Sequence, residues 1–146
     1  MIYDLESSTG YQLTLAARST ERSLDGLLEE YALTRLTWVA LVSVGSLSLS
    51  QPSRIADFMG LDRPKISRAL GALEELGLIE RSYSSSDARR VSVDVTRQGL
   101  DLLGELAPRV SARINHVLGA LSDAERAELR RLLRKVNEEK SEAVEY

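Results

Sequence analysis

The most constraining feature of this chain is a pair of short amphipathic segments, residues 50–59 and 63–76, separated by three residues that begin with Gly60. Apolar residues recur in both segments at helical spacing, and glycine readily adopts the left-handed conformation that ends a helix. Asp62 is a good N-cap for the second helix, and Ser50 is one for the first. Because so short a connection forces a sharp turn, the pattern predicts a helix-turn-helix.

The second helix has two unlike faces. One face is an apolar stripe that we expect to be buried: Ile66, Ala69, Leu70 and Leu73. The other face combines small residues with long hydrogen-bond donors: Arg63, Pro64, Lys65, Ser67, Arg68 and Gly71. A helix this slim can enter a DNA major groove, which is about 12 Å wide, and contact phosphates and base edges there.

Two strands are expected next, over residues 78–82 and 91–95, where apolar residues alternate with polar ones. They should pair as a hairpin around a polar loop, residues 83–90, which carries Asp87, Arg89 and Arg90. A hairpin that follows a helix-turn-helix is a wing. The predicted fold is therefore mainly α with a small β-hairpin wing, a winged helix-turn-helix.

Helical segments flank this unit on both sides. Residues 10–30 and 34–46 precede it, Thr96 caps a long helix after it, and Ser122 with Glu125 forms a capping box for a last helix. The outer helices have more apolar surface than one winged helix can cover, which implies a partner, most simply an identical chain. We expect residues 1–32 and 98–146 to form a dimerisation domain around a DNA-binding domain at residues 33–97.

Charge is distributed unevenly along the chain. The net charge is −3, which argues against coating nucleic acid without specificity, yet residues 63–97 carry seven basic and five acidic residues. Apolar runs fall short of the roughly 18 residues that cross a bilayer, and the N-terminus is acidic, unlike a secretory signal. We therefore expect a cytoplasmic protein.

Enzymatic chemistry finds little support. The chain has no cysteine, and its one histidine, His116, lies in a helical stretch where a surface or interface position is expected. Phosphate loops, nucleophile elbows and metal-ligand spacings are missing, and carboxylate pairs such as Glu74-Glu75 resemble solvated helix faces. We expect a non-enzyme without a metal or cofactor.

Several side chains are candidates for DNA contact. Arg68 and Lys65 are the main candidates for the major groove, with Ser67 and Arg63 beside them, because arginine can pair bidentately with guanine and lysine acts as a point charge. Backbone phosphates should be contacted at the start of the first helix, through Ser50, Ser53 and Arg54. The alternative is an ordinary solvated helix face.

An effector pocket between the lobes could be lined by aromatic residues and one arginine, a set that suits an aromatic carboxylate or acyl conjugate: Tyr11, Arg18, Tyr31, Trp38 and Phe58. The alternative is that these residues are core. For Trp38 and Phe58 the core is the favoured reading.

The order of these motifs resembles the multiple antibiotic resistance regulator (MarR) family of winged helix-turn-helix transcription factors over nearly the whole chain. The fragments that carry the resemblance are Gly10-Tyr11-Gln12-Leu13, Leu33-Thr34 with Trp38, Ile55-Ala56, Gly60-Leu61-Asp62, Ile66-Ser67-Arg68, Gly77-Leu78-Ile79-Glu80-Arg81, and Asp87-Ala88-Arg89 followed by Thr96 and Gly99.

The resemblance implies an obligate homodimer on a pseudo-palindromic DNA operator. In such proteins the wing arginine, here Arg89, enters the minor groove and the aspartate of the same motif, here Asp87, orients it. It also implies a repressor released from DNA by a small aromatic or anionic ligand. A protein-binding winged-helix module without an operator is the alternative, and the basic face with Arg89 favours DNA.

Overall fold

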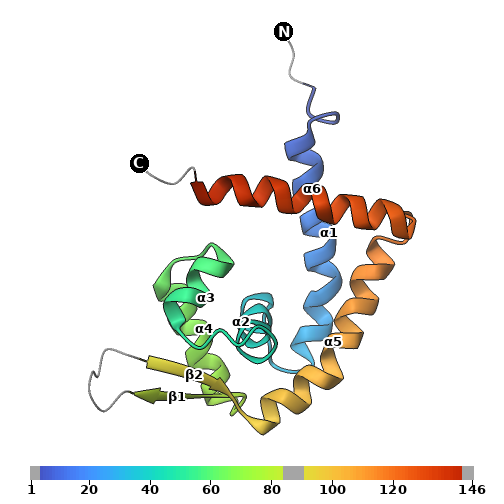
Figure 1. The fold of residues 1–146 in the computed structure, drawn as a ribbon. Coiled ribbons are helices and arrows are strands. Elements are labelled where there is room, and N and C mark those ends of the chain that lie inside the picture. The colour runs from blue at the N-terminus through green and yellow to red at the C-terminus, as the bar shows by residue number, and fades with distance from the viewer. Residues whose placement is uncertain (1–3, 84–90, 143–146) are drawn as a thin grey trace.

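The computed structural model describes residues 4–83 and 91–142, with side chains described up to residue 138. Within these ranges it contains six helices and one antiparallel hairpin (Figure 1), which confirms the predicted fold class. The elements in chain order are α1 (Thr9–Glu29), α2 (Arg35–Gly45), α3 (Pro52–Met59), α4 (Arg63–Glu75), β1 (Ile79–Tyr83), β2 (Val91–Val95), α5 (Arg97–Val117) and α6 (Asp123–Glu142).

Local capping chemistry sets most helix boundaries. Gly60 follows α3 with a φ of 63°, in the left-handed region that glycine adopts without strain. The Asp62 carboxylate then accepts the Lys65 amide at 2.8 Å and opens α4. Thr96 caps α5 in the same way, by accepting the Gly99 amide at 3.1 Å. The sharp turn predicted between α3 and α4 is therefore confirmed.

The predicted N-cap of α3 is wrong by one residue. Gln51 is the N-cap, and it makes no side-chain capping bond, while Pro52 begins the helix. Ser50 lies one residue before the N-cap. Its carbonyl is held beside the hairpin, because it accepts a hydrogen bond from the Val93 amide of β2 at 2.8 Å. The backbone contact that holds this segment beside β2 therefore outweighs the local preference of serine for a cap.

The two strands pair in register from Ile79 with Val95 to Tyr83 with Val91. β1 lies one residue later than predicted, from Ile79 to Tyr83. The Thr96 amide donates to the Leu78 carbonyl at 3.1 Å, which continues the register of the hairpin by one pair beyond the strand. The second strand has its predicted bounds.

The core lies where α2, α4 and the hairpin meet α1 and α5. It is built from buried aliphatic side chains and one tryptophan: Leu27, Leu28, Leu33, Trp38, Leu41, Val44, Ile55, Ile66, Leu70, Leu73, Leu78, Ile79, Val93, Leu103 and Leu106. Trp38 is thus core, as favoured. Phe58 is not, since 59% of it is exposed on the outer side of α3.

Two segments extend away from this lobe in Figure 1: the N-terminal half of α1, and the distal part of α5 with α6. Both carry large apolar side chains in solvent, among them Leu13 and Leu15 on α1 and Leu132 and Val136 on α6. None of the helices in the described ranges has the length and apolar character needed to cross a bilayer.

Candidate nucleic-acid interface

The two faces of α4 are separated as the sequence predicts. Ile66, Ala69, Leu70 and Leu73 are buried, with exposed fractions of 4% or less. Burying this stripe against α2 and α3 leaves the opposite side open to solvent. The residues exposed there are Arg63, Pro64, Lys65, Ser67 and Arg68. A helix face with three cations is therefore free to meet a DNA duplex.

The three cations on this face differ in whether they form an ion pair. Lys65 forms an ion pair with Asp62 at 3.3 Å, while Arg63 and Arg68 make no salt bridge to any residue that the structure describes. The backbone hydrogen bond from Lys65 lowers the pKa of the Asp62 carboxyl, so its negative charge persists beside the helix N-terminus. Of these two arginines without a salt bridge among the described residues, Arg68 is the one further into the helix.

The other predicted phosphate contacts lie at the start of α3. Arg54 is exposed, while Ser53 and Ser50 are partly buried. Asp87, Arg89 and Arg90 lie outside the described residues. The strands that lead to them are described, and Tyr83, the last residue of β1, is 64% exposed.

Arg81 on β1 is a residue whose role the sequence did not reveal. Its Nη2 donates to the Ser67 carbonyl of α4 at 3.1 Å, and its Nε lies 3.4 Å from the Glu74 carboxylate. Alternation along the strand puts Arg81 on the same side as buried Ile79, which was the available signal. Arg81 thus links the hairpin to the second turn of α4.

The structure places the residues predicted for an effector pocket in different settings. Trp38 is buried in the core, Phe58 is exposed on α3, and Arg18 is exposed on α1. A cleft of about 380 Å³ between the α1–α2 connection, the end of α4 and the start of α5 includes only Tyr31 of that set. Its lining residues are Tyr31, Leu76, Leu78, Gln98, Asp101, Leu102 and Glu105.

Tyr31 is held by charged partners at the edge of this cleft. Its hydroxyl donates to Glu105 at 2.6 Å and accepts from Arg109, which also pairs with Glu30 at 2.8 Å. The hydrogen bond to Glu105 raises the pKa of Tyr31, because ionisation would place two negative charges together. Glu30 raises the pKa of Arg109. This network ties the α1–α2 connection to α5.

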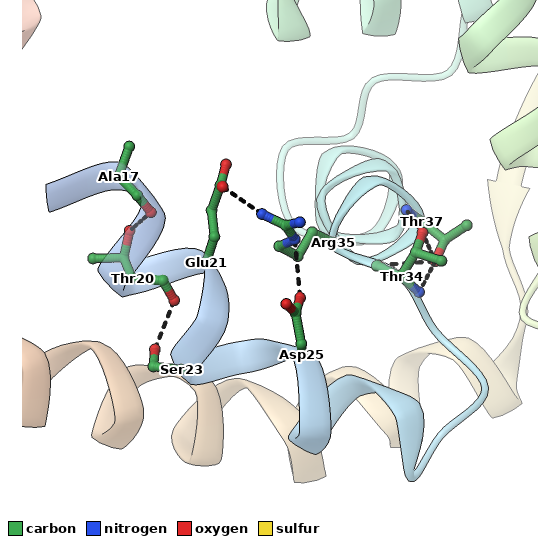
Figure 2. Close-up of polar contacts among 8 residues, drawn as sticks. All are labelled: Ala17, Thr20, Glu21, Ser23, Asp25, Thr34, Arg35 and Thr37. Atoms are coloured by element: carbon green, nitrogen blue, oxygen red, sulfur yellow. Dashed lines mark hydrogen bonds and ion pairs between the residues drawn. The ribbon is translucent and has the colours of Figure 1, made fainter. Parts of the chain in front are cut away.

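A second set of ion pairs joins α1 to the start of α2 (Figure 2). Arg35, the first residue of α2, pairs with Glu21 at 2.5 Å and with Asp25 at 3.0 Å, both on α1. Beside it, Thr34 and Thr37 exchange the reciprocal bonds of a capping box. The orientation of α2 is thus fixed both by its own cap and by α1.

In the described ranges, no group of three or more His, Asp or Glu side chains is arranged to hold a metal ion.

This chain is similar to known proteins in both sequence and structure. The model of the MarR family matches residues 33–91. A probable transcriptional regulator from Pseudomonas aeruginosa is 27% identical, covers 91% of this chain and 99% of its own, and superposes with a TM-score of 0.79.

Two further structures share the fold at lower identity. MepR of S. aureus, solved as a DNA complex, is 20% identical with a TM-score of 0.79, and the match covers 90% of this chain and 98% of MepR. BpsR of Bordetella bronchiseptica is 22% identical with a TM-score of 0.84, and the match covers 94% of this chain and 98% of BpsR. The resemblance found in the sequence is therefore confirmed: residues 33–91 of this chain form a MarR family domain, set in the fold of MarR-type transcriptional regulators.

Proposed function

We propose that this chain is a homodimeric transcriptional regulator that binds a specific sequence of double-stranded DNA. In this proposal α4 enters the major groove, with Arg68 and Lys65 as its main contacts and Arg63, Pro64 and Ser67 beside them. Ser50, Ser53 and Arg54 contact phosphates, and the wing residues Asp87, Arg89 and Arg90 address the minor groove. The observation that carries the proposal is the exposed basic face of α4 above a buried apolar stripe. The solved DNA complex of MepR, which has this fold, supports it.

Dimerisation is the second part of the proposal. Residues 1–32 and 98–146 would pair with the same segments of a second copy, while residues 33–97 form the DNA-binding domain. The support is the apolar surface that one chain leaves in solvent on α1 and α6, including Leu13, Leu15, Leu132 and Val136. A twofold dimer would present two α4 helices to a pseudo-palindromic operator, roughly 34 Å apart.

The third part is that the regulator is a cytoplasmic repressor that a small aromatic or acyl anion releases from DNA. The support is that the DNA binding of BpsR is regulated by 6-hydroxynicotinic acid, an aromatic acid. Calorimetric titration with phenolic acids and their thioesters tests this part. Absence of heat across the panel would remove the anionic effector from the proposal and leave DNA binding untouched.

The experiment that tests DNA binding is selection of a duplex from a random-sequence pool by the purified protein, followed by fluorescence anisotropy at several salt concentrations. We expect affinity to fall steeply with salt as phosphate counterions are released. Arg68→Ala should cost about 1–3 kcal/mol in binding, because it removes an exposed cation from the α4 face. Arg97→Ala is the matched control, because this arginine is 87% exposed, is paired with Asp101 and is not among the proposed DNA contacts, so the variant should bind like the wild type.

Failure to select any duplex, or affinity that does not respond to salt, would favour the protein-binding module instead.

A further inference from the structure

Arg81 belongs to β1, but its guanidinium contacts α4 at Ser67 and Glu74. The α4 groups nearest its guanidinium come from Ser67, Gly71 and Glu74, which share one helix face because they are four and three residues apart. A Cβ on Gly71 would lie 3.7 Å from the Arg81 Nη2, an ordinary van der Waals distance, so the guanidinium packs directly over this position. The side chain is only 18% exposed. Arg81 is therefore packed between the hairpin and α4.

Among the described residues, two further side chains bond to the backbone at the C-terminal end of α4. Thr96 donates its hydroxyl proton to the Gly77 carbonyl at 2.7 Å, and Gln98 donates to the Leu76 carbonyl at 3.4 Å. These bonds anchor the end of α4 to the start of α5. The N-terminal half rests on its apolar stripe, and apolar contact alone is non-directional. The Arg81 bond to Ser67 supplies a directional contact in that half.

The charge of Arg81 is offset locally. Its Nε is buried and meets the Glu74 carboxylate as an ion pair, without a hydrogen bond to any described residue. Glu74 is 45% exposed on the same face of α4. A neutralised and largely buried guanidinium is poorly suited to bind a phosphate, whereas its rigid fork of donors is well suited to hold a backbone carbonyl in one place.

We propose that Arg81 is a positioning residue for DNA recognition, an inference that rests on the proposed function. By holding Ser67 to β1, it fixes the rotation of α4 relative to the hairpin, so that the helix and the wing reach neighbouring grooves together. A small rotation of α4 would displace Lys65 and Arg68 from their contacts. Arg81 thus affects affinity without touching the duplex.

The test compares Arg81→Lys and Arg81→Met with the wild type on the duplex that the wild type selects, by anisotropy across a range of salt. We expect both variants to lose affinity about tenfold, because neither ammonium nor thioether reproduces the planar donor fork. The slope of log affinity against log salt should stay at the wild-type value, since no phosphate contact is lost. Arg97→Lys, at another ion-paired arginine, should change neither quantity.

Two outcomes would overturn the proposal. Wild-type affinity in Arg81→Lys would mean that charge alone matters at this position. A slope reduced by about one in Arg81→Met would mean that Arg81 contacts a phosphate directly.

Hydrogen exchange of the free protein separates positioning from a general structural role and does not depend on DNA. In both variants, amides around Ser67 and Gly71 should exchange faster, while those near Leu73 stay protected because the end of α4 keeps its ties to α5. Uniformly faster exchange along α4 and β1 would show that Arg81 only supports the fold. Failure of the wild type to select any duplex would instead overturn the proposed function, and the exchange pattern would still report on Arg81.

Discussion

Tyr31 donates its hydroxyl proton to Glu105 at 2.6 Å, across 74 residues of sequence. Arg109 donates to the same hydroxyl, and its guanidinium lies 5.4 Å from the centre of the Tyr31 ring. These contacts join the connection between α1 and α2 to the middle of α5. All three residues belong to the two segments proposed to dimerise, so these contacts hold α5 against the C-terminal end of α1.

The Tyr31 hydroxyl should titrate above its ordinary pKa of 10.0, because Glu105 stabilises the protonated form. A raised pKa in the folded state means that this stabilisation is present below 10.0 and is lost as the pH rises through the folded value. The measurement is an ultraviolet titration, with Tyr31→Phe subtracted to isolate this one tyrosine of five. Glu105→Gln should lower the pKa, and a wild-type value at or below 10.0 would contradict the assignment.

The cap of α4 should make stability depend on pH through Asp62. Its pKa is lowered by the Lys65 backbone amide, so the stabilisation is present above the ordinary value of 3.8 and is lost as the pH falls through the folded value. Asp62→Ala should lower the melting temperature at neutral pH, whereas Asp62→Asn, which can still accept the amide, should lower it less. Thermal melts followed by circular dichroism between neutral and acidic pH check this. If Asp62→Asn kept the full acid sensitivity of the wild type, another carboxyl would be responsible.

Gly99 should be intolerant of substitution, since a Cβ there would lie 2.1 Å from the Leu78 carbonyl oxygen and 2.7 Å from Val95. The clash is with backbone, which cannot yield easily, so Gly99→Ala should destabilise the protein by about 1–3 kcal/mol. Gly104→Ala on the same helix is the control. It meets nothing within 4 Å and should gain about 0.5–1 kcal/mol from helix propensity. Urea unfolding of the two variants measures both effects, and equal stabilities would show that α5 does not approach Leu78 this closely.

Truncation should destabilise the protein strongly at Trp38 and very little at Phe58. Trp38 is 7% exposed, and Trp38→Ala should cost about 3–5 kcal/mol of stability by opening a cavity. Phe58 is 59% exposed, and Phe58→Ser should change stability by no more than about 0.5 kcal/mol. Denaturant melts give both numbers. A large loss for Phe58→Ser would mean that its ring is covered in the working form of the protein, as it would be by a second copy.

The wing should contribute to DNA affinity through Arg89, a residue outside the described ranges. Arg89→Ala is expected to cost about 1–3 kcal/mol in binding to the selected duplex while leaving dimerisation unchanged. Anisotropy at moderate salt and sedimentation of the free protein measure the two properties. Unchanged affinity would remove the wing from the proposed mechanism.

The elements that could be predicted from the sequence are those set by local chemistry. Gly60 and Asp62 mark the sharp turn because a left-handed glycine and a carboxylate cap act within a few residues of the chain. The buried stripe of α4 follows from helical spacing alone, and the exposed face with Arg68 is its complement. The error at Ser50 has the opposite origin, since the Val93 amide that binds its carbonyl is 43 residues away in the chain.

Sequence by itself therefore determined the order of helices and strands, the position of the turn, and which side of α4 faces outward, because each depends on neighbours along the chain. Tertiary structure alone decided that Phe58 is exposed, that Tyr31 meets Glu105, and that Arg81 reaches Ser67. Amphipathic periodicity gives the direction of a side chain around its own helix or strand axis. It does not say which distant element packs there, and that packing is what selects the partner of each polar group.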